Sequence, residues 1–163
     1  MTNEEAIDAV LAFAVAACPE LAGHTYDFVP ASKPKGLPDM VAELQSEGVV
    51  LEDESFPIAR LQQAALRVWR IVLSIMVEAT PADAQDPSSV DAAHAAAQSQ
   101  LRAFGNTLLE GVMADHTLGG RVPLASPYVE IEYTPPYVEY EDGTRGREMT
   151  FSISVGALEG FED

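Results

Sequence analysis

The sequence predicts an α+β fold, in which a small, mainly antiparallel β-sheet packs against an N-terminal helix and one long amphipathic helix. Two segments carry apolar residues with the helical period, one near the start and one in the middle of the chain. Other segments alternate apolar and polar residues with the period of two that β-strands require. With 163 residues, of which 47% are hydrophobic, the chain can bury one core. We expect a single domain over residues 1–157, followed by an acidic tail at 158–163 that frays.

Two helices are predicted from caps and apolar faces. Residues 3–17 form the first, because Thr2 can cap its start and Pro19 ends it. Residues 88–115 form the second, with Asp86 as N-cap and a proline at the first helical position. Its apolar stripe consists of Val90, Ala93, Ala97, Leu101, Phe104, Leu108 and Val112. Such a stripe predicts packing of the helix against a sheet.

The strands before the long helix differ in how buried they should be. Residues 24–30 read as extended, and residues 37–51 as a half-buried strand. Residues 67–79 are rich in β-branched side chains, which favours a central strand covered on much of both faces. Residues 58–66 fit either a helix or the beginning of that strand.

The last third of the chain predicts antiparallel strands. Residues 128–133 alternate, and Pro135-Pro136 are expected to end that strand. Asp142-Gly143 is a hairpin signal, and residues 149–155 form the returning strand.

The junction between the long helix and these strands is the segment Asp115-His116-Thr117-Leu118-Gly119-Gly120-Arg121-Val122. Two consecutive glycines can adopt the positive φ angles that end a helix and reverse the chain. We therefore interpret Asp115, Thr117, Leu118, Gly119 and Gly120 as a structural turn. Gly105, inside the helix, is expected to mark a close contact or a slight bend, since glycine weakens a helix by about 1 kcal/mol relative to alanine.

The charge of the chain limits its partners. There are 26 acidic against 9 basic residues, for a net charge of −17. Such a surface repels phosphate backbones and anionic membranes. It suits a partner with a basic face, or a surface past which nucleic acid moves without adhering. The single cysteine, Cys18, excludes an internal disulfide and indicates a reducing compartment. An acidic beginning and short apolar runs predict neither a signal peptide nor a membrane span.

No residue pattern predicts catalysis, a cofactor or a metal site. His24, His94 and His116 are isolated from one another, and one cysteine cannot build a zinc site. Residues 52–54 lack the pattern of a calcium loop. Gly119 and Gly120 follow a helix, whose C-terminal dipole disfavours phosphate. We therefore predict that the protein is not an enzyme.

Tyrosines and glutamates are interleaved near the C-terminus, with Tyr137 and Tyr140 beside Glu139 and Glu141. Two interpretations stay open, cross-strand packing and a protein interface, because tyrosine is common in both. The candidate interface residues are Tyr128, Glu130 and Tyr133.

The order of elements, and above all the D-x-T-L-G-G-x-V pattern of residues 115–122, resembles the tail terminator (tail completion) proteins of long-tailed, siphovirus-type phages of actinobacteria. The resemblance implies an α+β fold and a ring of six subunits that ends polymerisation of the tail tube. It also implies a docking face for the head connector or head-closure protein, and a place in the tail and neck of the virion after assembly in the host cytoplasm. DNA would be a partner only in transit through the ring.

Acidic walls suit a lumen that passes DNA, because cationic contacts would slow its transit. Glu52, Asp53 and Glu54 are the candidate lumen-lining residues. A different neck protein, such as a connector or head-closure protein, is the nearest alternative. From another class, an acidic inhibitor or DNA mimic would occupy a basic site on its partner.

Overall fold

The computed structural model describes residues 1–28, 38–50, 64–122, 124–125, 130–139 and 145–160. The elements follow in the order α1 (Asn3–Ala17), the 3-10 helix η1 (Pro19–Leu21), β1 (Thr25–Tyr26), β2 (Asp39–Val50), β3 (Ala64–Glu78), α3 (Pro87–Ala114), β4 (Leu124–Ala125), β5 (Glu130–Glu139) and β6 (Arg145–Gly160). The predicted α+β fold is confirmed, as are the first helix, the long helix and the central strand.

The described strands form one sheet, in the order β1-β2-β3-β6-β4, with β5 also paired to β6. Only β1 and β2 run parallel; the other pairs are antiparallel. Along one side, β6 pairs with the whole of β3 through its residues 146–160. Along its other side, β6 pairs with β5 and then with β4. The last strand of the chain is therefore a central strand of the sheet.

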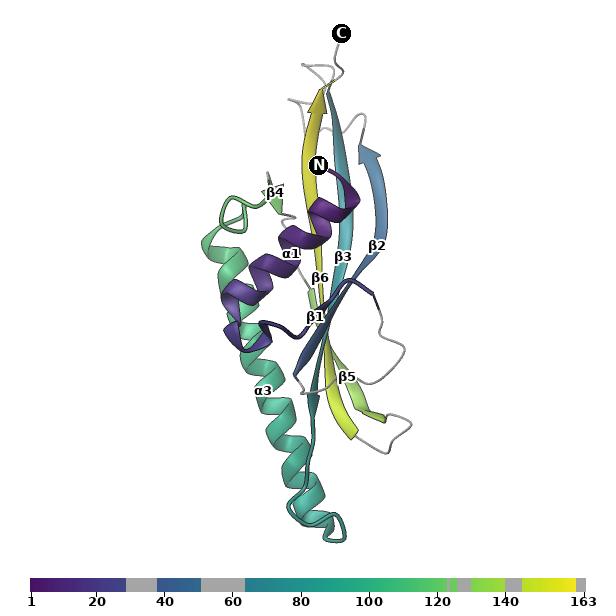
Figure 1. The fold of residues 1–163 in the computed structure, drawn as a ribbon, viewed down its shortest axis with the longest axis vertical. Coiled ribbons are helices and arrows are strands. Elements are labelled where there is room, and N and C mark those ends of the chain that lie inside the picture. The colour runs from purple at the N-terminus through teal and green to yellow at the C-terminus, as the bar shows by residue number, and fades with distance from the viewer. Residues whose placement is uncertain (29–37, 51–63, 123, 126–129, 140–144, 161–163) are drawn as a thin grey trace.

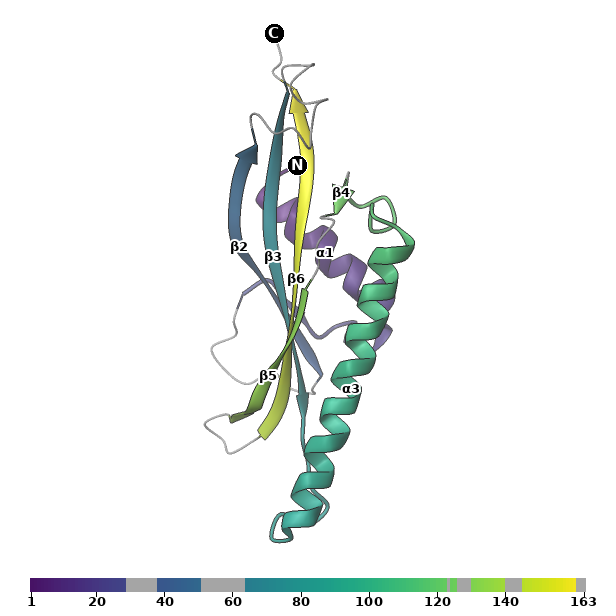
Figure 2. The ribbon, with the colours of Figure 1, turned by 180° about the vertical axis from the view of Figure 1, so that it is seen from behind.

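Both helices cover the same face of the sheet, and the opposite view presents that sheet without a helix in front of it (Figures 1 and 2). The side chains that alternate toward the helices are buried: Trp69, Ile71, Leu73, Ile75, Met149, Phe151, Ile153 and Val155. They meet the buried faces of α1 and α3 in one core. The upper ends of β3 and β6 project beyond the start of α1, and the N-terminal end of α3 extends past β5 (Figure 1).

The start of α1 is held by a capping box and by the sheet. The Thr2 hydroxyl accepts a hydrogen bond from the Glu5 amide at 3.2 Å, and the Glu5 carboxylate accepts one from the Thr2 amide at 2.7 Å. Asn3 Oδ1 accepts from Trp69 Nε1 at 2.8 Å and from Arg67 Nη2 at 3.2 Å. The Arg67 guanidinium also lies 4.8 Å from the centroid of the Trp69 ring. One asparagine therefore satisfies a buried indole and fixes where α1 meets β3.

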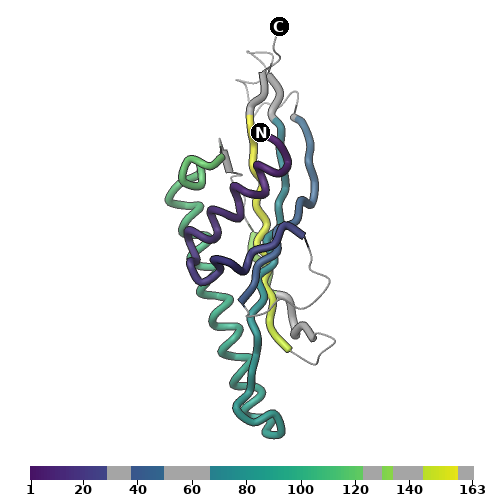
Figure 3. The backbone as a smooth tube through the Cα atoms, viewed as in Figure 1, coloured from purple at the N-terminus to yellow at the C-terminus, as the bar shows by residue number. Residues whose placement is uncertain are grey.

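The long helix begins where the chain reverses direction after β3, as the teal tube shows in Figure 3. Asp86 caps it by accepting a hydrogen bond from the Ser88 amide at 3.1 Å. At Gly105 the helix approaches the sheet so closely that a Cβ atom would lie 2.7 Å from Tyr133 Oη and 3.1 Å from Ile131 Cδ1. Of the two expectations for this glycine, the close contact is confirmed.

Two predictions about strand ends are corrected. Pro135 and Pro136 do not end their strand: β5 continues through them, and its register with β6 shifts between Thr134 and Val138. An edge strand tolerates proline, because one side of its backbone needs no partner. The last strand continues to Gly160, beyond the expected boundary at residue 157. Residues 64–66 belong to β3, whereas 58–63 and 161–163 lie outside the described residues.

Among the described residues no helix lies over the second face of the central strand, which is covered only in part (Figure 2). Of the β3 side chains that point away from the helices, Met76 is buried, whereas Val72 and Ser74 are half-buried and Arg70 is exposed. The apolar character of Val72 reflects the strand's β-propensity rather than a second packed layer. Residues 24–30 were expected to be extended, and within them the strand β1 comprises two residues only.

Candidate functional site

The segment from Asp115 to Val122 is a hydrogen-bonded turn. Asp115 Oδ1 accepts from the Thr117 amide at 2.8 Å and from its hydroxyl at 2.6 Å, and Oδ2 accepts from the Gly119 amide at 3.1 Å. The Thr117 hydroxyl in turn accepts from the Gly120 amide at 2.9 Å. The three hydrogen bonds to Asp115, of which the one from the Thr117 hydroxyl has the largest effect, lower the pKa of the Asp115 carboxyl below its usual value.

The glycines of this turn are required by the backbone. Leu118, Gly119 and Gly120 have φ angles of 53°, 75° and 80°, which L side chains adopt reluctantly. Leu118 adopts this strained backbone conformation while its side chain is buried in the core, where it is 1% exposed. A Cβ at Gly119 would also overlap the Arg121 guanidinium. Each polar or glycine position of the D-x-T-L-G-G pattern therefore has a local structural role.

The three histidines do not come together. His94 Nδ1 accepts a hydrogen bond from Arg147 Nε at 3.2 Å. Burial, and then the nearby Arg147 and Arg145 guanidinium groups, lower the pKa of His94. His24 precedes β1, and its carbonyl accepts from the Met40 amide at 2.8 Å. His116 is exposed in the turn. Among the described residues, no three His, Cys, Asp or Glu side chains are grouped so that they could hold a metal ion.

The candidate interface residues lie on different faces. Tyr133 pairs with Met149 on the side of the helices, is half-buried, and reaches Gly105. Its placement is an intramolecular packing contact, one of the two interpretations left open by the sequence. Glu130 is exposed and pairs with Ser152 on the other side of the sheet. Tyr128, Tyr140, Glu141 and the candidate lumen residues Glu52, Asp53 and Glu54 lie outside the described residues.

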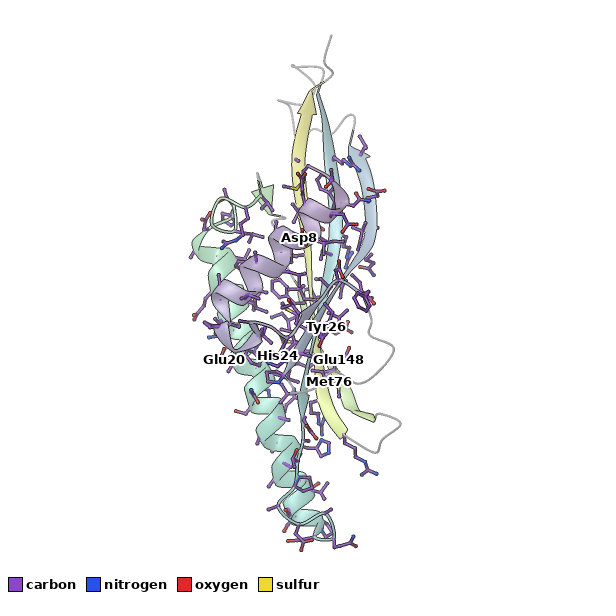
Figure 4. All side chains as sticks on the ribbon, viewed as in Figure 1. Asp8, Glu20, His24, Tyr26, Met76 and Glu148 are labelled. Carbon is purple, nitrogen blue, oxygen red and sulfur yellow. The ribbon has the colours of Figure 1, made fainter. Side chains whose placement is uncertain are left out.

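The side of the sheet away from the helices carries a surface that sequence reasoning did not identify. Its side chains follow from the register in three rows across β2, β3, β6 and β5. We call it the open face: the first row is Asp39, Met76 and Glu148; the second is Val41, Ser74, Thr150 and Glu132; the third is Glu43, Val72, Ser152 and Glu130. Tyr26 of β1 pairs with Val41 at its margin. Figure 4 labels Tyr26, Met76 and Glu148 where the strands cross.

Carboxylates crowd one end of the open face. Burial, and then repulsion from Asp39 and Glu43, raise the pKa of Glu148. Asp39 is 4% exposed, and burial raises its pKa, although its own backbone amide and His24 act in the opposite direction. On this side of the sheet, the arginine of β3 nearest to these carboxylates is Arg70, which lies one row beyond Val72 in the described part of the strand. The surface is therefore strongly acidic, and the neighbouring Asp39 and Glu43 add to the effect of burial in destabilising the charged form of Glu148.

No protein-family model and no curated protein matches this sequence. Within the described residues, neither α1 nor α3 combines the length with the apolar character that crossing a bilayer requires.

Proposed function

We propose that this protein is a structural component of a phage virion, a tail terminator that closes the tail tube as a ring of six subunits. The proposal rests on the resemblance in element order and in the turn pattern at residues 115–122. One structural observation supports it: both helices lie on one face of the sheet, and no described helix covers the opposite face (Figures 1 and 2). In this role the protein has no catalytic duty, and its contacts are with copies of itself, the tail tube protein and the head connector.

The sheet also has two unlike edges, a geometry that suits a ring. The described strands place β2, with β1 beside its beginning, at one edge and β4 and β5 at the other. An exposed edge offers unpaired backbone groups to a neighbouring strand. Contact between two unlike edges is head-to-tail, and such contacts close into rings when the rotation between subunits permits.

The charge is consistent with a ring that DNA traverses. A net charge of −17 disfavours adhesion of the phosphate backbone to the walls. The candidate lumen residues Glu52, Asp53 and Glu54 stay a prediction. Replacing all three with lysine is expected to impair DNA passage while leaving ring formation intact.

The test is the oligomeric mass measured by light scattering on a sizing column, for the protein alone and mixed with the tail tube protein encoded by the same phage. A mass of six protomers, or sixfold rings on tube ends in electron micrographs, is expected. A protein that stays monomeric and leaves tube length unchanged in a polymerisation assay would contradict the proposal. A ring that binds the connector but not the tube would indicate a different neck protein.

An acidic inhibitor or DNA mimic is the second candidate, and the carboxylates of the open face favour it. Such a protein would act as a monomer or dimer and compete with nucleic acid for a basic site. Competition with DNA for a purified nucleic-acid enzyme, without any ring, is the result that would prefer this candidate.

A further inference from the structure

We infer that the open face is a docking surface for an amphipathic helix of another protein, whose apolar stripe is flanked on both sides by lysine or arginine. This inference concerns a different contact from the ring and does not depend on the proposed function.

The side chains at the centre of the open face are short and carry both methyl and hydroxyl groups. Along β3 and β6 the neighbouring side chains are Val72, Ser74, Thr150 and Ser152, all small and all half-buried. Val41 extends this strip onto β2 and is also half-buried. Methyl groups of valine and threonine give an apolar stripe something to pack against, while the hydroxyls tolerate water.

The borders of this strip are acidic on both sides. In one row Glu43 of β2 and Glu130 of β5 are the outermost side chains, with Val72 and Ser152 between them. Both glutamates are exposed. Neighbouring strands are separated by about 4.8 Å, so the three intervals from β2 to β5 span roughly 14 Å. An α-helix with its side chains is about 10–12 Å across. The space between the two acidic borders is therefore wide enough for one helix.

Charge selects the kind of partner. A second copy of the same face would place carboxylate against carboxylate, which is unfavourable in any orientation. A basic helix would instead place cations beside Glu43, Glu130 and Glu132, and would relieve the repulsion that raises the pKa of Glu148. Binding is therefore expected to lower the pKa of Glu148 toward its ordinary value.

An aromatic pair at the margin supplies an anchor. The rings of Tyr26 and Phe28 meet edge to face, with centroids 6.3 Å apart and planes at 82°. Phe28 is 61% exposed although it is a large apolar side chain. Exposed aromatic residues beside a row of charges are typical of the side chains that dominate binding energy in protein interfaces.

The probe for the test is a fluorescein-labelled synthetic peptide of about 14 residues, built from alanine, leucine and lysine. Its leucines recur with the helical period and its lysines flank them on both sides. A peptide of identical composition with leucine and lysine alternating serves as the comparison. Binding is measured by fluorescence polarisation at low salt, and the contact is mapped by NMR of the valine methyl groups, with Val41 and Val72 expected to shift.

The matched variants remove two charges each. Glu43→Gln with Glu132→Gln changes the open face, whereas Asp8→Asn with Glu110→Gln changes exposed positions on α1 and α3. The open-face variant is expected to weaken binding of the helical peptide roughly three- to tenfold, as two partly screened ion pairs would. The control variant should change it less than twofold. Phe28→Ala should weaken it about tenfold without altering the unfolding transition.

Three results would overturn the inference. Equal losses in both double variants would mean that only net charge attracts the peptide. Equal binding of the helical and alternating peptides would exclude a helix as the occupant. Methyl shifts confined to residues outside the open face would place the contact elsewhere. None of these outcomes bears on whether a ring forms, which is measured separately.

Discussion

The close approach of Gly105 to Tyr133 predicts opposite effects of Gly105→Ala on stability in two backgrounds. The substitution should destabilise the wild-type protein and stabilise a Tyr133→Phe variant. Alanine at position 105 improves intrinsic helix stability by about 1 kcal/mol. Its Cβ, however, would lie 2.7 Å from Tyr133 Oη, closer than real Cβ atoms approach. Overfilling a packed site of this kind typically costs about 1–3 kcal/mol. Gly105→Ala is therefore expected to lower the free energy of unfolding by about 1 kcal/mol.

Removing the hydroxyl reverses this expectation. In a Tyr133→Phe background the nearest remaining atoms are Ile131 Cδ1 at 3.1 Å and Met149 Sδ at 3.2 Å, both at the ends of flexible side chains. Small shifts of these atoms admit the methyl group, so Gly105→Ala should now stabilise the protein by up to about 1 kcal/mol. The two changes should be coupled by about 1–2 kcal/mol, well above the error of additivity for distant sites.

The assay is urea unfolding of the four proteins of this double-mutant cycle. Trp69, the single tryptophan, is fully buried in the core and reports the transition by fluorescence. Equal slopes of the unfolding free energy against urea would show that only stability has changed. If Gly105→Ala has the same effect with tyrosine or phenylalanine at position 133, the reasoning is refuted, because Tyr133 would not occupy the space above the glycine.

Three further predictions concern the rest of the fold. Asn3→Ala should lower the free energy of unfolding by about 1–3 kcal/mol, because it leaves the buried Trp69 Nε1–H without its acceptor. Asn3→Asp keeps an acceptor oxygen and should retain most of the wild-type stability. Urea unfolding measures both variants, and equal losses would contradict the prediction. Gly120→Ala should lower the free energy of unfolding by about 1–2 kcal/mol. The cost comes from the φ of 80° alone, because nothing lies within 4 Å of the added Cβ. An unchanged midpoint of thermal unfolding would count against this prediction. Glu148→Gln should flatten the pH dependence of stability. Burial, and then repulsion from Asp39, raise the folded-state pKa of Glu148, so the folded protein holds the proton more tightly and wild-type stability falls as pH rises through that pKa. Unfolding measured from about pH 4 to about pH 7 should show a steeper fall in wild type than in the variant.

Local signals predicted the helices and the central strand well. The capping box at Thr2 and Glu5 and the stop at Pro19 are contained within a few residues, so the limits of α1 could be read from the chain. The turn at residues 115–122 was equally local, because Asp115 and Thr117 bond to amides two to four residues away. The β-branched side chains of residues 67–79 also identified β3 as a central strand.

Features that depend on strand pairing were beyond this reasoning. The sequence places Glu43 and Glu130 in strands, but it does not state that β2 and β5 border the same pair of central strands. The open face could therefore not be assembled in advance. Pro135 and Pro136 were interpreted without knowing that β5 lies at an edge, where proline does not end pairing. Tyr133 was likewise undecided until Gly105 was placed beneath it.

The position of β6 at the centre of the sheet has a consequence for synthesis of the protein. Its partners β3, β4 and β5 precede it in the chain, and β3 is separated from it by the whole of α3. While the chain emerges from the ribosome, β3 can pair with β2. The other backbone edge of this long, apolar strand stays unpaired until residues 145–160 arrive. An edge of that kind is a template for pairing with other nascent chains. Pairing over such sequence separations is also slow. A nascent chain stalled before Arg145 is therefore expected to need a chaperone, and the yield of native protein should depend on how soon the last strand is delivered.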